Sequence, residues 1–243
     1  MEVYRYISFN TLKEVVEKKR LYFVNPFVKW SDTKEGSLYR IAQDISKLDK
    51  HNDILSGYKY KEQIIKQLQN GGIVANENNE GILDWFGMRC QSWSKSRNSL
   101  KMWNRYSYNN CAVCIAVDTS KLLSLHSQNQ KVYGFDVQYK SEINISEEIQ
   151  QAIGRNGEFY FPFILQTKQK NLFEFENEYR LYILQLNSQG HFIGENHDSV
   201  YVSIDYEIDE FIDEVFVHPN ASEDYVKSIR KYVENFNINF SEK

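Results

Sequence analysis

Hydrophobic residues along this chain follow two periods, which predict strands and helices in irregular alternation. β-branched and aromatic residues at 3–7 predict a strand, and Leu12, Val15 and Val16 recur at helical spacing behind Ser8 or Asn10, either of which can cap a helix over 11–19. Further strands are expected at 21–24, 111–117, 132–139, 180–186, 199–204 and 214–217, and further helices at 97–108, 119–125, 146–153 and 221–236.

The order of these elements favours one α+β domain over residues 1–243. No internal repeat and no regular strand–helix–strand unit is visible, so we expect a mixed or mainly antiparallel sheet flanked by helices. Residues 37–69 carry apolar positions three and four apart, which predicts two amphipathic helices. Gly71 and Gly72 and the Asn-rich run 76–80 follow. We interpret 37–80 as a helical and loop insertion within the domain.

Charge and hydropathy narrow the function classes. The net charge is −4 and the sequence pI is about 5.8, which argues against generic nucleic-acid binding, because that needs clustered Lys and Arg. The opening residues have no basic region followed by an apolar one, and no uncharged apolar run approaches the ~18 residues that span a bilayer. The expected location is the cytoplasm, with no membrane association.

Cysteine usage predicts neither a disulfide framework nor a metal site. Cys90, Cys111 and Cys114 are too few and too irregularly spaced for a set of disulfides. Cys111 and Cys114 fall in a strand-like apolar run, which favours two core thiols on opposite faces of a strand. A zinc site would need two further soft ligands, and His126 and His218 do not supply a matching pair.

Common catalytic signatures are absent from the sequence. It contains no Gly-x-Gly-x-x-Gly, no phosphate-binding Gly-x-x-x-x-Gly-Lys loop, no Gly-x-Ser-x-Gly and no His-Glu-x-x-His. The usual dinucleotide-fold, NTP-hydrolysing, α/β-hydrolase and zinc-protease interpretations therefore have no support. What remains is a set of short polar and aromatic motifs spread along the chain.

Four of these stretches together resemble a known bacterial family. The last of them, Ile212-Asp-Glu-Val-Phe-Val-His-Pro219, has His218 where that family more usually has Gly. With this departure, the chain resembles the family known as domain of unknown function 2971, whose name assigns no activity. The other three stretches are Tyr4-Arg-Tyr6 with Leu21-Tyr-Phe-Val-Asn-Pro26, Cys90-Gln-Ser-Trp-Ser94 with Leu100-Lys-Met-Trp-Asn-Arg-Tyr106, and Phe173-Glu-Phe-Glu-Asn-Glu-Tyr-Arg180.

A second likeness suggests a chemistry. Arg5 on the first strand, Ser92 with Ser94 on a later strand, and Glu176 with Glu178 late in the chain resemble the arginine, Ser-x-Ser and Glu-x-Glu signature of ADP-ribosyltransferases, in the same order. This resemblance implies NAD as substrate, a protein acceptor, and an enzyme of a toxin or antiphage system. It also implies that these side chains converge on one cleft.

Each residue type suits a step of that chemistry. Cleavage between nicotinamide and ribose develops an oxocarbenium-like cation, which the carboxylate of Glu178 would stabilise. Arg5 would anchor the ribose or a diphosphate oxygen, and Ser92 would position the ribose or the glutamate. If Glu176 and Glu178 lie in extended chain they face the same side, so Glu176 could address the acceptor.

Alternatives remain open for the aromatic and basic residues. Trp103 and Tyr106 could stack on nicotinamide, or could form a core-facing helical stripe. Lys168 and Lys170 resemble a solvated pair of charges that could also meet an anionic ligand. Arg5 could simply pair with Glu176 or Glu178 in a structural ion-pair network, with Arg180 as a further partner.

The sequence is therefore compatible with two functions. One is an NAD-using enzyme, and the other is a non-catalytic ligand-sensing or protein-interaction module. The sequence does not predict the oligomeric state. A closed ion-pair network without an adjacent cavity would favour the module, whereas convergence of Arg5, a serine hydroxyl and Glu178 on a cavity would favour the enzyme.

Overall fold

A computed structural model describes residues 1–24, 88–127, 130–142, 167–184, 201–207 and 211–242 of the chain. The helices expected within 37–69 and at 146–153, and the loop at 71–80, lie outside the described residues. The described strands are β1 (Glu2–Ser8), β2 (Arg20–Val24), β3 (Met88–Ser94), β4 (Ala112–Asp118), β5 (His126–Ser127), β6 (Gln130–Asp136), β7 (Gln138–Lys140), β8 (Thr167–Gln169), β9 (Glu178–Leu184), β10 (Tyr201–Asp205), β11 (Glu214–Val217) and β12 (Asn239–Ser241).

Helices accompany these strands without a regular repeat. The helices are α1 (Phe9–Lys18), α7 (Leu100–Tyr106), α8 (Thr119–Ser124), α10 (Lys170–Phe173), the 3₁₀ helix η3 (Glu174–Glu176) and α11 (Glu223–Glu234). Within the described residues, ten strands form one sheet, along the path β12-β11-β4-β1-β3-β9-β6-β5, with β2 beside β3 and β10 beside β2. Only β11 and β12 pair in parallel in it, and β7 and β8 form a separate parallel pair. The predicted α+β class with a mainly antiparallel sheet is confirmed.

Local sequence sets the ends of the helices. The hydroxyl of Ser8 accepts a hydrogen bond from the Thr11 amide at the start of α1, as predicted, and Asp118 caps α8 in the same way. The strand expected at 132–139 is interrupted at Val137, whose amide donates to the carbonyl of Glu178. Cys111 lies before β4 and is exposed, so the prediction of a core thiol was wrong there.

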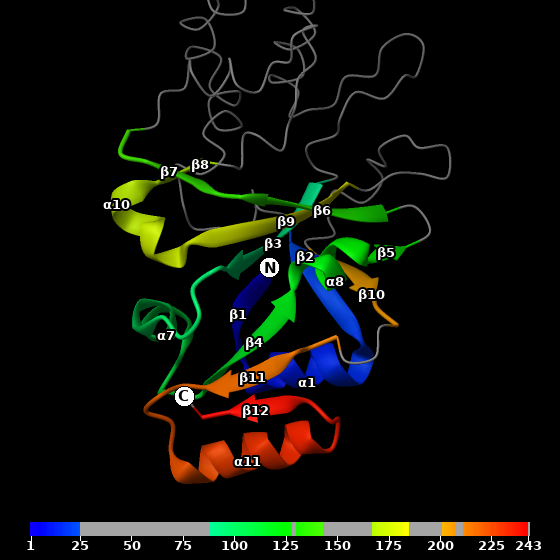
Figure 1. Ribbon diagram of the computed structural model, residues 1–243, viewed down its shortest axis with the longest axis vertical. Helices are drawn as coiled ribbons and strands as arrows, with labels where there is room; N and C mark the ends of the chain where they lie inside the picture. Colours follow the sequence, from blue (N-terminus) through cyan, green and yellow to red (C-terminus); the bar gives the residue numbers. More distant parts are fainter. Residues whose placement is uncertain (25–87, 128–129, 143–166, 185–200, 208–210, 243) are drawn as a thin grey trace, which may run out of the picture.

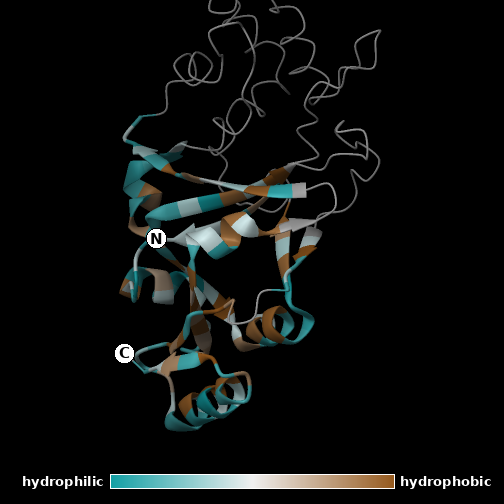
Figure 2. Ribbon diagram, turned by 45° about the vertical axis from the view of Figure 1, so that its right-hand side comes forward, coloured by the Kyte–Doolittle hydropathy of each residue, from teal (hydrophilic) through white to brown (hydrophobic). Residues whose placement is uncertain are grey.

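Apolar side chains cover both faces of the sheet. On one face, residues of β1, β4 and β11 pack against α1 and α11, with Val3, Ile115 and Ile229 among them. On the other face, Tyr6 and its neighbours pack against α7. Figure 2 shows the hydrophobic residues concentrated on these central strands, with hydrophilic residues along the outer side of α11. An apolar layer therefore separates the central strands from the helices on each face of the sheet.

The sheet changes direction between β1 and β3. Seven residue pairs join β1 to β4 and seven join β3 to β9, but β1 and β3 pair only at Tyr4 and Ser94. Figure 1 shows β9 and β6 running across the direction of β1 and β4. The two halves of the sheet therefore separate beside that single pair. In the described part of the chain, no helix is long and apolar enough to cross a membrane.

Candidate functional site

A cavity of about 380 Å³ lies where β1 and β3 separate, bounded also by α7 and by the segment from β8 to the start of β9. This volume falls within the ~300–1,000 Å³ of typical small-molecule sites. Six of the seven residues singled out from the sequence line it: Arg5, Ser92, Ser94, Tyr106, Glu176 and Glu178. Residues more than 170 positions apart in the sequence therefore meet at one concave surface.

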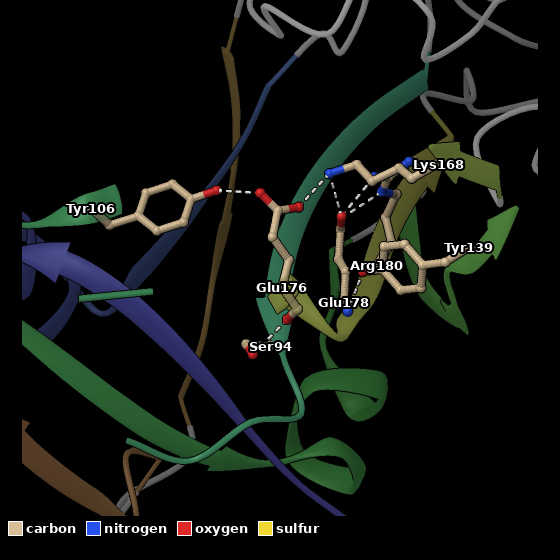
Figure 3. Close-up of polar contacts among 7 residues, drawn as sticks. All are labelled: Ser94, Tyr106, Tyr139, Lys168, Glu176, Glu178 and Arg180. Carbon is tan, nitrogen blue, oxygen red and sulfur yellow. Dashed lines mark hydrogen bonds and ion pairs between the residues drawn. The ribbon is translucent and has the colours of Figure 1, made fainter. Parts of the chain in front are cut away.

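Two buried glutamates share one ammonium group in this cavity. Lys168 Nζ lies 2.7 Å from Glu176 Oε2 and 2.7 Å from Glu178 Oε2. Arg180 Nε and Nη2 donate to the two oxygens of Glu178 at 2.7 and 2.9 Å, and the hydroxyl of Tyr106 donates to Glu176 Oε1 at 3.1 Å. Figure 3 shows the ammonium of Lys168 between the two carboxylates. Each negative charge is thus matched by a positive one inside the fold.

A turn brings the two glutamates together. Glu176 ends η3, Asn177 is in the left-handed region at φ 42° and ψ 55°, and Glu178 begins β9. The extended segment considered from the sequence is therefore wrong, although both carboxylates still reach the same cation. Asn tolerates left-handed backbone better than most residues, which suits this position. The hydroxyl of Ser94 fastens the turn by donating to the Glu176 carbonyl at 2.7 Å.

The charges around Glu178 decide its protonation. Burial alone would raise the pKa of this carboxyl, but the charges of Arg180 and Lys168 and their hydrogen bonds lower it to about 2. For Tyr106, burial and then the Glu176 charge raise the pKa of the phenol above its ordinary value. Glu178 is therefore an anion and Tyr106 a neutral hydrogen-bond donor at neutral pH.

The two lysines of this region behave differently. Lys170 is half exposed and pairs with Glu174 four residues on, as expected of a solvated charge. Lys168 is only 7% exposed, so its interpretation as a solvated charge was wrong. It lies on β8, beside β7, with its ammonium 5.1 Å from the ring centre of Phe173. The buried partner of the two glutamates is thus Lys168.

Arg5 and Ser92 contribute polar groups that the fold leaves open to the cavity. Across the described ranges, no hydrogen bond or ion pair joins either side chain to another residue, so the structural pairing of Arg5 with a glutamate, one of the alternatives from the sequence, is not what the structure shows. Arg5 is partly exposed, yet burial lowers its pKa to about 10. Its guanidinium lines the cavity and remains charged at neutral pH, and no carboxylate of the described residues pairs with it.

The two serines of the Ser-x-Ser pair differ in their hydrogen bonds. Ser94 Oγ donates to the Glu176 carbonyl and accepts from the Ser96 amide at 3.0 Å, whereas Ser92 makes no such bond within the described residues. Ser94→Ala should therefore lower the free energy of unfolding by about 1–3 kcal/mol, because it leaves buried backbone groups unpaired. Ser92→Ala should change it by less than about 0.5 kcal/mol. Equal losses in urea denaturation of the two variants would contradict this difference.

The two aromatic candidates also separate. Trp103 is fully buried, with its ring 4.7 Å from Tyr6 and 5.4 Å from His218 in edge-on geometry, and its indole N–H donates to Asn98 Oδ1 at 2.9 Å. It does not line the cavity, so its role as a stacking surface for a ligand was wrong and its place in the core is confirmed. Tyr106 lines the cavity and is 46% exposed.

Sequence reasoning missed several residues of the site. Arg105 and Tyr139 were not considered. Arg180 was expected only as a further partner in an ion-pair network of the glutamates, and its two hydrogen bonds to Glu178 confirm that expectation. Tyr139 accepts a hydrogen bond from the Glu178 amide at 2.8 Å, which fixes the start of β9. A weak signal existed for Arg105, since it follows Met102 by three residues on the predicted helix and so shares its face.

Comparisons with known proteins add no relative to this description. No family model, no curated protein and no solved structure matches the chain. The site therefore has to be interpreted from its own geometry. Within the residues that the structure describes, no group of three or more His, Cys, Asp or Glu side chains is placed to hold a metal ion.

Proposed function

We propose that this protein is an NAD-using enzyme of the ADP-ribosyltransferase type, acting in the cytoplasm as part of a bacterial toxin or antiphage system. The observation that carries this proposal is the meeting of Arg5, Ser92, Glu176 and Glu178 at one cavity. The likeness to the domain of unknown function 2971 family supports the bacterial setting. The order of the motifs in the sequence supports the reaction class.

The chemistry follows from the charges of the site. The bond between ribose C1′ and the nicotinamide nitrogen breaks, and its electron pair leaves with nicotinamide. Glu178, held as an anion, stabilises the cation that develops on the ribose. A nucleophile of a protein acceptor, or water, then bonds to C1′ and gives up a proton. Glu176 lies close enough to share Lys168 with Glu178, and it would orient that nucleophile.

Lys168 sets a condition on this reaction. Both oxygens of Glu178 accept hydrogen bonds from Arg180, and Oε2 also faces Lys168. A ribose hydroxyl can reach Oε2 only if the ammonium gives way, whereas the guanidinium can stay in place. Contact of a ribose hydroxyl with Oε2 would therefore require a shift of the Lys168 side chain when substrate binds.

A specific observation favours the second function, a ligand-sensing module without catalysis. The two glutamates, Lys168 and Arg180 form a matched, buried set of charges, which is typical of structural networks. In that case the cavity would bind a ligand through Arg5 and Ser92, and the glutamates would only hold β9 in place. NAD would then bind without being cleaved.

The deciding experiment measures nicotinamide release from NAD by the purified protein, with and without a cell extract as a source of acceptors. Release above the rate without protein is the expected result. A melting temperature raised by NAD, with no release under either condition, would overturn the enzyme and leave the sensing module. Neither release nor a shift would overturn both.

Ser92→Ala tests whether release depends on this cavity without disturbing the fold. Loss of one hydrogen bond to bound substrate should slow release about 3- to 10-fold, while the melting temperature stays within 1–2 °C of wild type, because the hydroxyl has no partner among the described residues. Ser228→Ala, on the exposed face of α11, is the matched control and should release nicotinamide at the wild-type rate. Equal rates in all three proteins would place the reaction elsewhere.

A further inference from the structure

Helix α7 presents a second arginine to the cavity. Met102, Arg105 and Tyr106 lie three and four residues apart, so they share one face of the helix, and all three line the cavity. Arg105 is exposed. Among the residues that the structure describes, no ion pair or hydrogen bond engages its side chain. Two guanidinium groups, those of Arg5 and Arg105, therefore line one cavity without an anionic partner.

The charges of the cavity do not balance. The two glutamates are matched by Lys168, which bridges them, and by Arg180, which grips Glu178 through two hydrogen bonds. Among the lining residues that the structure describes, Arg5 and Arg105 are the remaining charged ones, and both are positive. The unmatched charge is thus that of two cations, in a protein whose net charge is −4. An anionic ligand would meet a local attraction that the surface as a whole does not provide.

Burial strengthens this argument at Arg5. Its position among protein atoms lowers the pKa of the guanidinium to about 10, so the charge is held there at a cost in hydration. An anion bound against Arg5 would offset that cost. Structural arginines at such positions normally pair with a carboxylate, and neither glutamate of this cavity takes that role.

We infer that Arg5 and Arg105 form a subsite for a diphosphate group. A guanidinium pairs with phosphate oxygens through two parallel hydrogen bonds, and two separate guanidiniums suit a group with two linked phosphates. The hydroxyl of Ser92, which has no partner among the described residues, supplies a further donor in the same cavity. Apolar contacts from Met102 and Phe173 complete a surface for the organic part of a nucleoside diphosphate. This subsite rests on the proposed function, in which Arg5 anchors the ribose or a diphosphate oxygen, and deepens it by adding Arg105 as a second phosphate ligand.

The test measures binding of ligands that have no nicotinamide to release. Thermal melting and calorimetry would compare ADP, inorganic pyrophosphate and adenosine with the wild-type protein. ADP and pyrophosphate should bind and raise the melting temperature, and adenosine should do neither. Binding of ADP that is stronger than that of pyrophosphate assigns the subsite to nucleotides, and equal binding assigns it to the diphosphate alone.

Arg105→Gln is the decisive variant, and Lys101→Gln is its matched control. Lys101 lies on the same helix, is exposed and does not line the cavity, so its loss removes the same charge from the same element. ADP should bind Arg105→Gln at least tenfold more weakly and Lys101→Gln about as strongly as wild type. Equal weakening in both variants would overturn the inference, as would binding of adenosine as strong as that of ADP.

The subsite and the enzyme can fail separately. If ADP binds through Arg105 but no nicotinamide is released from NAD, the subsite stands and the proposed reaction is overturned. If nicotinamide is released at an unchanged rate by Arg105→Gln and ADP does not bind the wild-type protein, the reaction stands and the diphosphate subsite is overturned.

Discussion

Glu178→Gln should reduce nicotinamide release by about 100-fold or more, because it removes the charge that stabilises the ribose cation. The same change should lower the free energy of unfolding by about 3–5 kcal/mol, since the buried guanidinium of Arg180 loses the carboxylate charge that it pairs with and the ammonium of Lys168 loses one of its two carboxylates. Loss of stability alone therefore cannot separate an enzyme from a binding module. The rate has to be expressed per folded molecule, with the folded fraction measured by circular dichroism at the assay temperature.

Glu174→Gln is the matched control for this variant. Glu174 lies in the same short segment, is more than half exposed and pairs only across the surface with Lys170 among the described residues. Its replacement should leave release unchanged and alter stability by less than about 0.5 kcal/mol. A Glu178→Gln protein that is destabilised, yet releases nicotinamide at the wild-type rate per folded molecule, would show that Glu178 is structural.

The sequence predicted helices and strands correctly where helix caps and apolar patterns agreed with the burial seen in the structure. The hydroxyl of Ser8 caps α1, and the predicted strand at 214–217 is β11 to the residue. Both follow from short-range rules about caps and apolar runs. Strand β12 was missed because Asn239–Ser241 is too short and polar to stand out, and its place depends on pairing with β11. Long-range pairing of this kind leaves little trace in local sequence.

Most residues of the site could be predicted from the sequence, but the contacts between them could not. Arg5, Ser92 and Glu178 were found through a motif, and strand pairing does place Ser94 opposite both Tyr4 and Glu178. Nothing in the run Gln-Thr-Lys-Gln-Lys indicates that Lys168 is buried while Lys170 is exposed. That difference arises because Lys168 on β8 lies against the cavity. Tertiary packing, and not the local sequence, therefore determines which of the two lysines is buried.

Lys168→Met should weaken the pH dependence that Glu178 gives to stability. In the wild-type protein the pKa of Glu178 is lowered to about 2, below its unfolded value of ~4.3, so its contribution is complete above that value and is lost as the pH falls towards 2. Without Lys168, Glu176 keeps only the Tyr106 hydroxyl as a side-chain donor among the described residues. Glu178 keeps Arg180 but loses the charge and the hydrogen bond of Lys168, so its pKa is lowered less in the variant than in the wild-type protein.

The variant should therefore be about 3–5 kcal/mol less stable than wild type at pH 7.5, and the deficit should shrink as the pH falls to about 2.5, because Glu178 then gains protons in the wild-type protein and its pairing with Lys168 is lost there too. Urea denaturation at the two pH values measures both quantities. Lys170→Met, two residues away on an exposed pair, should cost less than about 0.5 kcal/mol at either pH. A Lys168→Met deficit that stays constant with pH, or that matches the Lys170→Met control, would mean that Lys168 does not bridge the two glutamates in solution, and that substrate need not displace it.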